Sequence, residues 1–258
     1  KINMIKKRGQ VTIFIIVAVI VVAVAALFFA FAPKLGIEFG NDAQNPQDFI
    51  QTCVEDDLND VVTQISMQGG SLNPELYFEY NNIPVSYLVY SSEYGFSGTL
   101  QQPLLREHIK QELKDEIYPT IQNCFTQLKS SYENKNYGVS INPGEIGFQI
   151  LPKRVLLNLN YSVTLSKENT ETYEEFYVVV DNNLYELLDI VINMIEFLSN
   201  PNYCNIEPNL YMIAYPAIKV EEPVLSNDIG AHIEIITQRE SGNKFQFAWR
   251  SCAIAPGY

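Results

Sequence analysis

Basic residues are scarce in this chain. Its 258 residues contain 17 lysines and arginines against 30 aspartates and glutamates, for a formal charge of −13. Four of the basic residues fall within residues 1–9, so the remainder carries 13 basic and 30 acidic residues, or −17. So few cations cannot neutralise a phosphate backbone, which argues against nucleic acid as a partner. The acidic excess suits a soluble domain outside the cell.

Histidine is also rare, and the residue patterns of common catalytic sites are missing. The sequence has no G-x-S-x-G, H-E-x-x-H, Walker or dinucleotide-binding pattern. His108 is predicted to be a surface residue that can pair with Glu112, and His232 is predicted on the polar face of a strand. We therefore predict no catalytic residue, no cofactor and no metal site. A pocket that gathers His108 or His232 with several carboxylates would instead indicate an enzyme.

Charge is absent from the twenty residues Ile13 to Ala32. A helix of that length spans roughly 30 Å, the thickness of the hydrocarbon core of a bilayer. The basic residues Lys6 to Arg8 precede the run and should stay in the cytoplasm. We therefore expect residues 1–9 to be a cytoplasmic segment, residues 10–32 to be one transmembrane helix in contact with lipid, and the rest to lie outside the cell membrane.

Only four cysteines are present, and all follow the apolar run: Cys53, Cys124, Cys204 and Cys252. They form no C-x-x-C pattern, so disulfides in an oxidising exterior are expected rather than zinc. Cys53 and Cys124 fall on the apolar stripes of two predicted helices, which can pack face to face. Cys204 follows a third helix, and Cys252 ends the last strand. These positions predict the pairs Cys53–Cys124 and Cys204–Cys252.

Helical periodicity accounts for three stretches beyond the span. Residues 33–47 lack a period and are predicted to be a linker. Apolar residues recur at helical spacing near residues 48–69, 103–131 and 183–199. Asp48 is predicted to cap the first helix and Gly69-Gly70 to end it. Pro119 is predicted to kink or divide the second helix.

Alternation of apolar and polar residues predicts strands over residues 137–180 and 229–252. Together with the helices, they predict an α+β domain at residues 48–258, with amphipathic helices on a mainly antiparallel sheet. Its helical part is expected at 48–132 and its sheet-rich part at 137–258.

Short elements and local motifs complete the prediction, and two of them have alternative interpretations. Short strands are predicted at residues 83–90 and 210–218. The acidic run at residues 55–60 is typical of a solvated helix face, although it has the chemistry to bind a cation. The tyrosine-rich segment 71–101 either packs over the helices or lines a binding surface. Asn160-Tyr161-Ser162 is an N-glycosylation sequon, whose use requires an outward-facing Asn160.

The N-terminal segment Lys6-Lys7-Arg8-Gly9-Gln10-Val11-Thr12 resembles the class III signal of archaeal type IV pilins and archaellins. In that family a peptidase cuts after the glycine and the apolar helices bundle into a filament core. The resemblance implies cleavage between Gly9 and Gln10. Phe14 stands at the fifth mature position, where many pilins carry glutamate.

Most of the chain is similar to uncharacterised single-pass surface proteins of small-genome archaea. The features that carry this likeness are the KRGQVTxFII-type anchor, the helix with Cys53 that ends in Gln68-Gly69-Gly70, the helix with Cys124, and the closing Phe245-Gln246-Phe247-Ala248. The resemblance implies a cell-surface location and this architecture, and no activity.

These observations predict a membrane-anchored cell-surface structural or interaction protein without enzymatic activity. Its partners would be other surface proteins or like subunits. A pilin-like filament subunit processed after Gly9 is the first alternative. An anchored solute-binding or hydrolytic ectodomain is the second, and a deep apolar cleft lined by tyrosines of residues 77–96 would favour solute binding.

Overall fold

The structure covers most of the chain beyond the predicted membrane span. A computed structural model describes residues 45–92, 98–200, 202, 206–226 and 230–250. The predicted transmembrane helix, the linker up to residue 44, the Gly9–Gln10 cleavage site and the Cys204–Cys252 pair lie outside these residues. Within the described residues, no helix has both the length and the apolar character needed to cross a bilayer.

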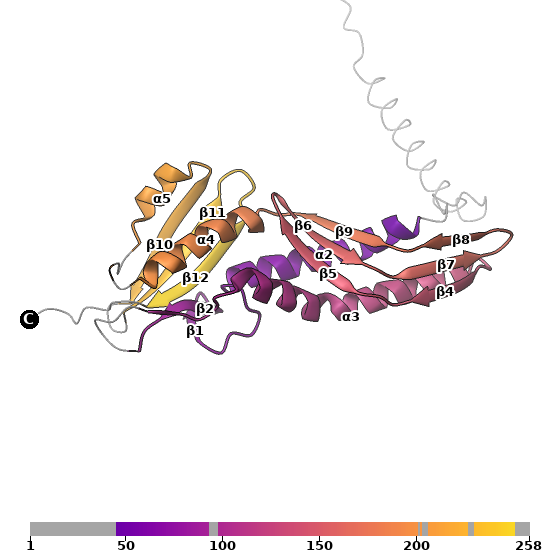
Figure 1. The fold of residues 1–258 in the computed structure, drawn as a ribbon, viewed down its shortest axis with the longest axis horizontal. Coiled ribbons are helices and arrows are strands. Elements are labelled where there is room, and N and C mark those ends of the chain that lie inside the picture. The colour runs from indigo at the N-terminus through magenta and orange to yellow at the C-terminus, as the bar shows by residue number, and fades with distance from the viewer. Residues whose placement is uncertain (1–44, 93–97, 201, 203–205, 227–229, 251–258) are drawn as a thin grey trace, which may run out of the picture. The chain divides into compact units, whose positions relative to one another are not determined.

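Two antiparallel helices, α2 (Pro46–Met67) and α3 (Leu105–Glu133), are the longest described elements of the fold and pack against each other (Figure 1). The side chain of Asn45, and not Asp48, caps α2 by accepting from the Gln47 amide at 3.0 Å. Pro119 lies inside α3 without dividing it. Ile117 and Ile121 on either side of this proline are fully buried, and their packing offsets the one helical hydrogen bond that proline removes.

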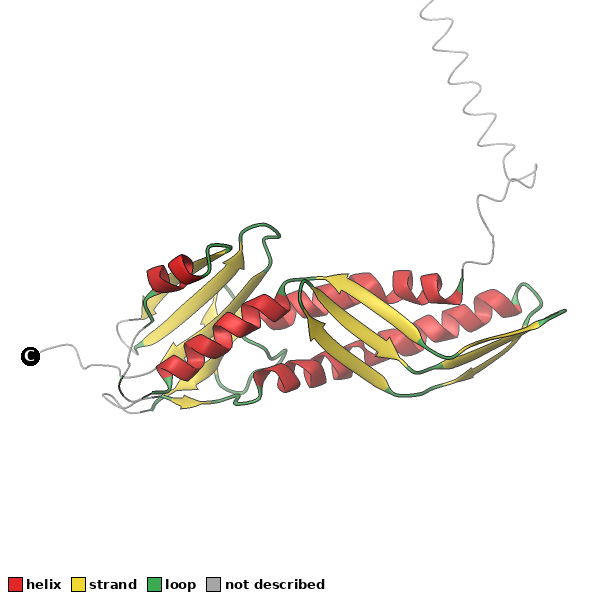
Figure 2. Cartoon of the chain, turned by 45° about the horizontal axis from the view of Figure 1, so that its top comes forward, coloured by secondary structure: helices red, strands yellow, loops and turns green. Residues whose placement is uncertain are grey.

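Six strands form a bent antiparallel meander along this helix pair (Figure 2). The strands are β4 (Gly138–Asn142), β5 (Ile146–Leu151), β6 (Arg154–Leu159), β7 (Ser162–Ser166), β8 (Thr170–Tyr173) and β9 (Phe176–Asp181). They make two three-stranded sheets, β4-β7-β8 and β5-β6-β9, that follow one another along the same three passes of the chain. Gly144 lies at the break between the sheets. Only glycine fits there, because a Cβ would lie 1.8 Å from the Asn160 carbonyl oxygen.

The remaining strands form a separate mixed sheet. They are β1 (Tyr77–Tyr80), β2 (Ile83–Tyr90), β3 (Thr99–Leu100), β10 (Ile218–Ser226), β11 (Ala231–Gln238) and β12 (Lys244–Arg250), paired in the order β1-β2-β12-β11-β10 with β3 also on β2. The predicted strand at 83–90 is confirmed, and the strands predicted within 229–252 are confirmed as the antiparallel C-terminal hairpin β11–β12. The pairing of β2 with β12 is parallel and joins segments far apart in sequence. The single sheet expected over residues 137–180 and 229–252 is therefore wrong, since these two regions pair with different partners.

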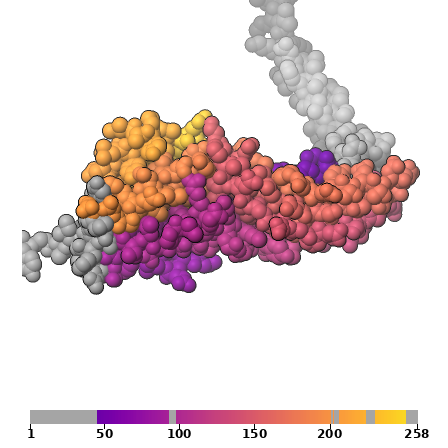
Figure 3. Space-filling model, viewed as in Figure 1, coloured from indigo at the N-terminus to yellow at the C-terminus, as the bar shows by residue number. Residues whose placement is uncertain are grey.

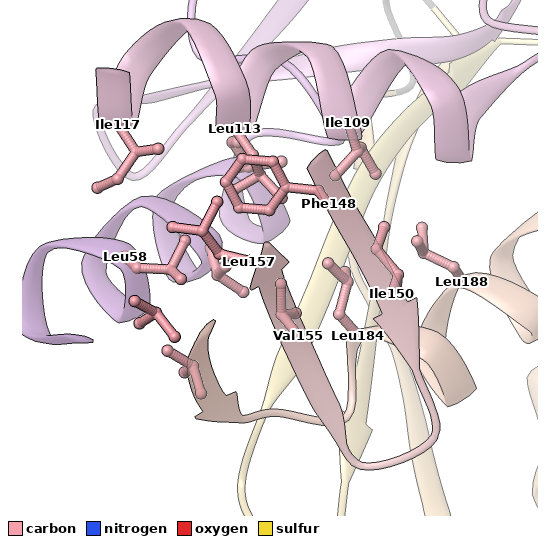
Figure 4. Packing of buried hydrophobic residues seen from close by; sticks show 14 of the residues in the cluster. Leu58, Ile109, Leu113, Ile117, Phe148, Ile150, Val155, Leu157, Leu184 and Leu188 are labelled. Atoms are coloured by element: carbon pink, nitrogen blue, oxygen red, sulfur yellow. The ribbon is translucent and has the colours of Figure 1, made fainter. Parts of the chain in front are cut away.

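Helices α4 (Leu184–Leu198) and α5 (Pro208–Ala214) complete the fold. α4 packs on both the mixed sheet and the meander, and α5 lies beside β10. The strand predicted at residues 210–218 is wrong, because Pro208 opens α5 and β10 begins only at Ile218. Figure 4 shows the core where α2, α3, β5, β6 and the start of α4 meet around Leu58, Leu113 and Phe148. The predicted α+β class with mainly antiparallel sheets is confirmed.

Candidate functional site

A polar cleft lies between the C-terminal end of α2, the start of α3 and strand β2. Its volume is about 430 Å³. Its lining includes Ser71, Asn73, Glu75, Gln102, His108 and Glu112, with Tyr87 also on the wall. Tyr87 is the one described tyrosine of residues 77–96 in this lining, and most of its neighbours are polar. The cleft is thus not the apolar, tyrosine-lined cleft that would favour solute binding.

Two glycines place Ser71 in the cleft. Gly69 and Gly70 have positive φ angles of +74° and +95°, which glycine adopts without strain. The Gly70 amide donates to the Ile65 carbonyl at 2.9 Å and closes the end of α2 as predicted. A Cβ at Gly69 would lie 3.0 Å from the Ser86 Cβ, and one at Gly70 would lie 2.7 Å from a Leu105 methyl. The glycines therefore let the chain turn closely between β2 and α3.

The turn brings Ser71 against a histidine of α3. Ser71 Oγ lies 2.5 Å from His108 Nε2. Glu112 Oε1 lies 3.6 Å from the same Nε2, and Glu112 Oε2 accepts from the Leu72 amide at 3.1 Å. The His108 side chain is only 26% exposed. The chain after α2 folds back over part of His108 and leaves the histidine in the lining of the cleft, and the predicted pairing with Glu112 is confirmed.

The three side chains have the chemistry of an activated hydroxyl. A neutral imidazole whose Nε2 lacks a proton accepts the hydrogen bond of the Ser71 hydroxyl. Glu112 faces the nitrogen that would receive the serine proton, and not Nδ1, which a carboxylate contacts in a Ser-His-Asp triad. The group is therefore a serine–histidine pair with a nearby carboxylate. A hydroxyl and an imidazole from separate elements give no signal in a linear motif search.

The second histidine lies in a different environment. His232 on β11 stacks on Trp249 with ring centroids 3.8 Å apart, and its Nδ1 contacts Glu222 Oε1. Trp249 is 1% exposed, and its indole N–H donates to Glu234 Oε1 at 3.3 Å. The predicted location of His232 on a polar strand face is wrong, because strand pairing puts it on the face that also carries Trp249 and Glu234.

Glu234 is a carboxyl residue whose pKa departs clearly from its ordinary value. Its side chain is fully buried, and its Oε2 has no hydrogen-bond partner among the described residues. Burial above all, and then the nearby Glu222, raise the pKa of Glu234, the Trp249 hydrogen bond lowers it, and the net pKa is about 8. Glu234 is therefore a neutral acid at pH 7.

The remaining predicted sites occupy the helix pair and the meander. Cys53 and Cys124 form a disulfide between α2 and α3 with Cα atoms 5.9 Å apart, which confirms that pair. Asn160 is exposed at the break between β6 and β7. In the acidic run, Asp57 accepts from the Thr120 hydroxyl at 3.0 Å and Glu55 accepts from the Gln51 amide at 2.8 Å. Among the described residues, no three side chains of His, Cys, Asp or Glu are grouped closely enough to hold a metal ion.

No family model, curated protein or solved structure matches this chain.

Proposed function

We propose that the chain is a membrane-anchored cell-surface protein whose residues 48–258 lie outside the membrane and contact other surface proteins or like subunits. The observation that carries this proposal is the disulfide between Cys53 and Cys124. Such bonds persist in oxidising compartments outside the cytosol. The apolar run at residues 13–32 supplies a segment of spanning length, and Lys6 to Arg8 supply the basic flank that orients it.

Exposed apolar side chains support the interaction part of the proposal. No residue of α5 is buried, and Leu210 and Ile213 are 63% and 76% exposed. A groove of about 350 Å³ beside them runs between α5 and α4 and includes Tyr211 and Tyr215. The space-filling view shows this orange region at the molecular surface (Figure 3). Apolar side chains gathered in this way mark surfaces that contact other molecules.

The test is the topology of the full chain in intact cells. Protease added outside should digest a C-terminal epitope, and non-reducing peptide mapping should recover the Cys53–Cys124 peptide. Replacing the basic residues Lys6 to Arg8 with glutamate is the matched control, and it should weaken this orientation. Protection of the epitope until lysis, or free thiols at Cys53 and Cys124, would contradict the proposal.

Two further readouts come from the same preparation. A native N-terminus at Gln10 would indicate pilin-type processing, whereas an intact Lys6 to Gly9 segment would indicate a plain anchor. Exposure of Asn160 supports its glycosylation outside the membrane. A glycan there should disappear in Ser162→Ala and remain in Ser162→Thr, which keeps the sequon.

A further inference from the structure

We propose that Ser71 and His108 form a nucleophile–base pair and that the polar cleft hydrolyses small neutral or cationic esters. This activity goes beyond the anchored surface role and does not depend on it. A catalytic nucleophile needs a base within hydrogen-bond reach and a space in which the substrate carbonyl can sit. The cleft has both.

The contact between hydroxyl and imidazole is formed before any substrate enters. Ser71 Oγ and His108 Nε2 are 2.5 Å apart, within the distance needed for direct proton transfer. The residues on both sides of Ser71 are held in place, since the Gly70 amide donates to Ile65 and the Leu72 amide donates to Glu112. Ser71 therefore has little freedom to move away from the base. Such preorganisation lowers the entropic cost of the reaction.

The reaction balances with water as the only co-reactant. Ser71 Oγ attacks the ester carbonyl carbon while its proton passes to His108 Nε2. The bond to the leaving alcohol then breaks, and that alcohol takes the proton from Nε2. Water attacks the resulting acyl-serine with His108 as base, which releases a carboxylic acid and restores the Ser71 hydroxyl.

Glu112 is a positioning residue in this scheme. Its Oε1 lies 3.6 Å from the nitrogen that gains the proton, so the carboxylate stabilises the imidazolium when it forms. Its Oε2 is held by the Leu72 amide at 3.1 Å, which fixes the carboxylate in this orientation. The arrangement assigns Glu112 a role in the charged intermediate rather than in the resting state.

The lining of the cleft sets the class of substrate. Glu75 and Glu112 contribute carboxylates, whereas lysine and arginine are missing from the lining. An anionic ester would therefore be repelled, and a neutral or cationic one accepted. Asn73 and Gln102 also line the cleft, and a side-chain amide is the donor type that can stabilise the oxyanion of acyl transfer.

The experiment uses the full-length chain in detergent with a fluorophosphonate probe and p-nitrophenyl acetate. We expect phosphonylation at Ser71 and ester hydrolysis, and both should be lost in Ser71→Ala. Ser66→Ala is the matched control, because Ser66 is equally buried, bonds the Val62 carbonyl and lies outside the cleft. His108→Gln should slow labelling by about 100-fold, while His232→Gln should leave it unchanged. Glu112→Gln should lower kcat by about tenfold and alter the pH profile of labelling.

The other possible outcomes of this experiment also support or contradict the proposed hydrolysis. Absence of label at Ser71 in protein that unfolds cooperatively would overturn the proposal, as would hydrolysis that survives Ser71→Ala. If Ser71→Ala fails to fold, labelling of the folded wild-type protein and its loss in His108→Gln carry the test. Equal labelling in His108→Gln and wild type would contradict the proposal. It would show that the pair only stabilises the contact between α3 and the residues that follow α2.

Discussion

The two histidines of the chain occupy two regions that differ in what surrounds them. His108 on α3 faces the polar cleft and contacts a serine hydroxyl and a glutamate from the same wall. His232 on β11 contacts Glu222 and lies flat against Trp249. Both histidines therefore have a carboxylate partner. Of the two, His108 lines the polar cleft, whereas His232 packs against a buried indole.

The difference shows that a histidine–glutamate pair acquires its role from what surrounds it. Around His108, the cleft leaves room for a substrate carbonyl beside the hydroxyl. Around His232, the indole of Trp249 fills that space and Glu234 is enclosed without solvent. A buried carboxyl avoids the large cost of burying a charge by keeping its proton. The region around His232 therefore makes the stability of the fold depend on pH. The region around His108 instead presents a hydroxyl and an imidazole to the cleft.

The largest expected effect concerns Glu234. Its pKa is about 8 in the folded chain against 4.5 for an ordinary glutamate. Between these values the unfolded chain has released the proton that the native chain retains, so raising the pH favours unfolding. This contribution to stability should be fully present below pH 4.5 and be lost as the pH rises to 8, at about 1.4 kcal/mol per pH unit and on the order of 5 kcal/mol in all.

Glu234→Gln tests this and sharpens the comparison. The amide has the same shape and does not titrate, so the difference in unfolding free energy between variant and wild type should grow with pH across the window. Urea unfolding at pH 5, 6.5 and 8 measures it. Glu112→Gln, at the open site, should keep the wild-type slope. A slope that persists unchanged in Glu234→Gln would show that another group causes it.

The next effect should separate the two regions. Replacing Cys53 and Cys124 with alanine removes a cross-link between residues 71 positions apart. The free energy of unfolding should fall by about 4 kcal/mol or less, by the chain-entropy relation. The bridge joins α2, whose C-terminal end leads into Ser71, to α3, which carries His108, so the polar cleft should loosen more than strands β11 and β12. Hydrogen exchange should accelerate in residues 68–72 and 105–112 and change less in β11 and β12. Equal acceleration in both regions would contradict this separation.

The smallest effect compares the histidines directly. His232→Gln removes a stacked ring beside Trp249 and should cost about 1–2 kcal/mol of unfolding free energy. His108→Gln removes a ring at the edge of an open cleft, and glutamine can still bond Ser71, so the cost should stay below about 1 kcal/mol. Thermal unfolding of both variants at pH 7 gives the ranking. The reverse ranking would show that the His108 group is the more important for folding.

Periodicity in the sequence was sufficient for the long helices and the strand regions. The stripe of Ile50, Val54, Leu58, Val62 and Ile65 repeats every three to four residues, and all five side chains are fully buried in α2. The same signal places α3 and α4, and alternation places the meander and the C-terminal hairpin. Cys53 and Cys124 could be paired because both lie on such stripes. The short helix α5 was missed because seven mostly apolar residues satisfy a strand as well as a helix.

Neighbouring residues and composition were enough to predict the long helices, the meander strands, the bond between α2 and α3 and the acidic balance, because these features are local or depend on composition. The tertiary structure alone decided that β2 pairs with β12, that Ser71 reaches His108, and that His232 and Glu234 share the face of Trp249. Each of these contacts joins separate elements of the fold. No local period or spacing encodes them, since they follow from how complete helices and sheets exclude water together.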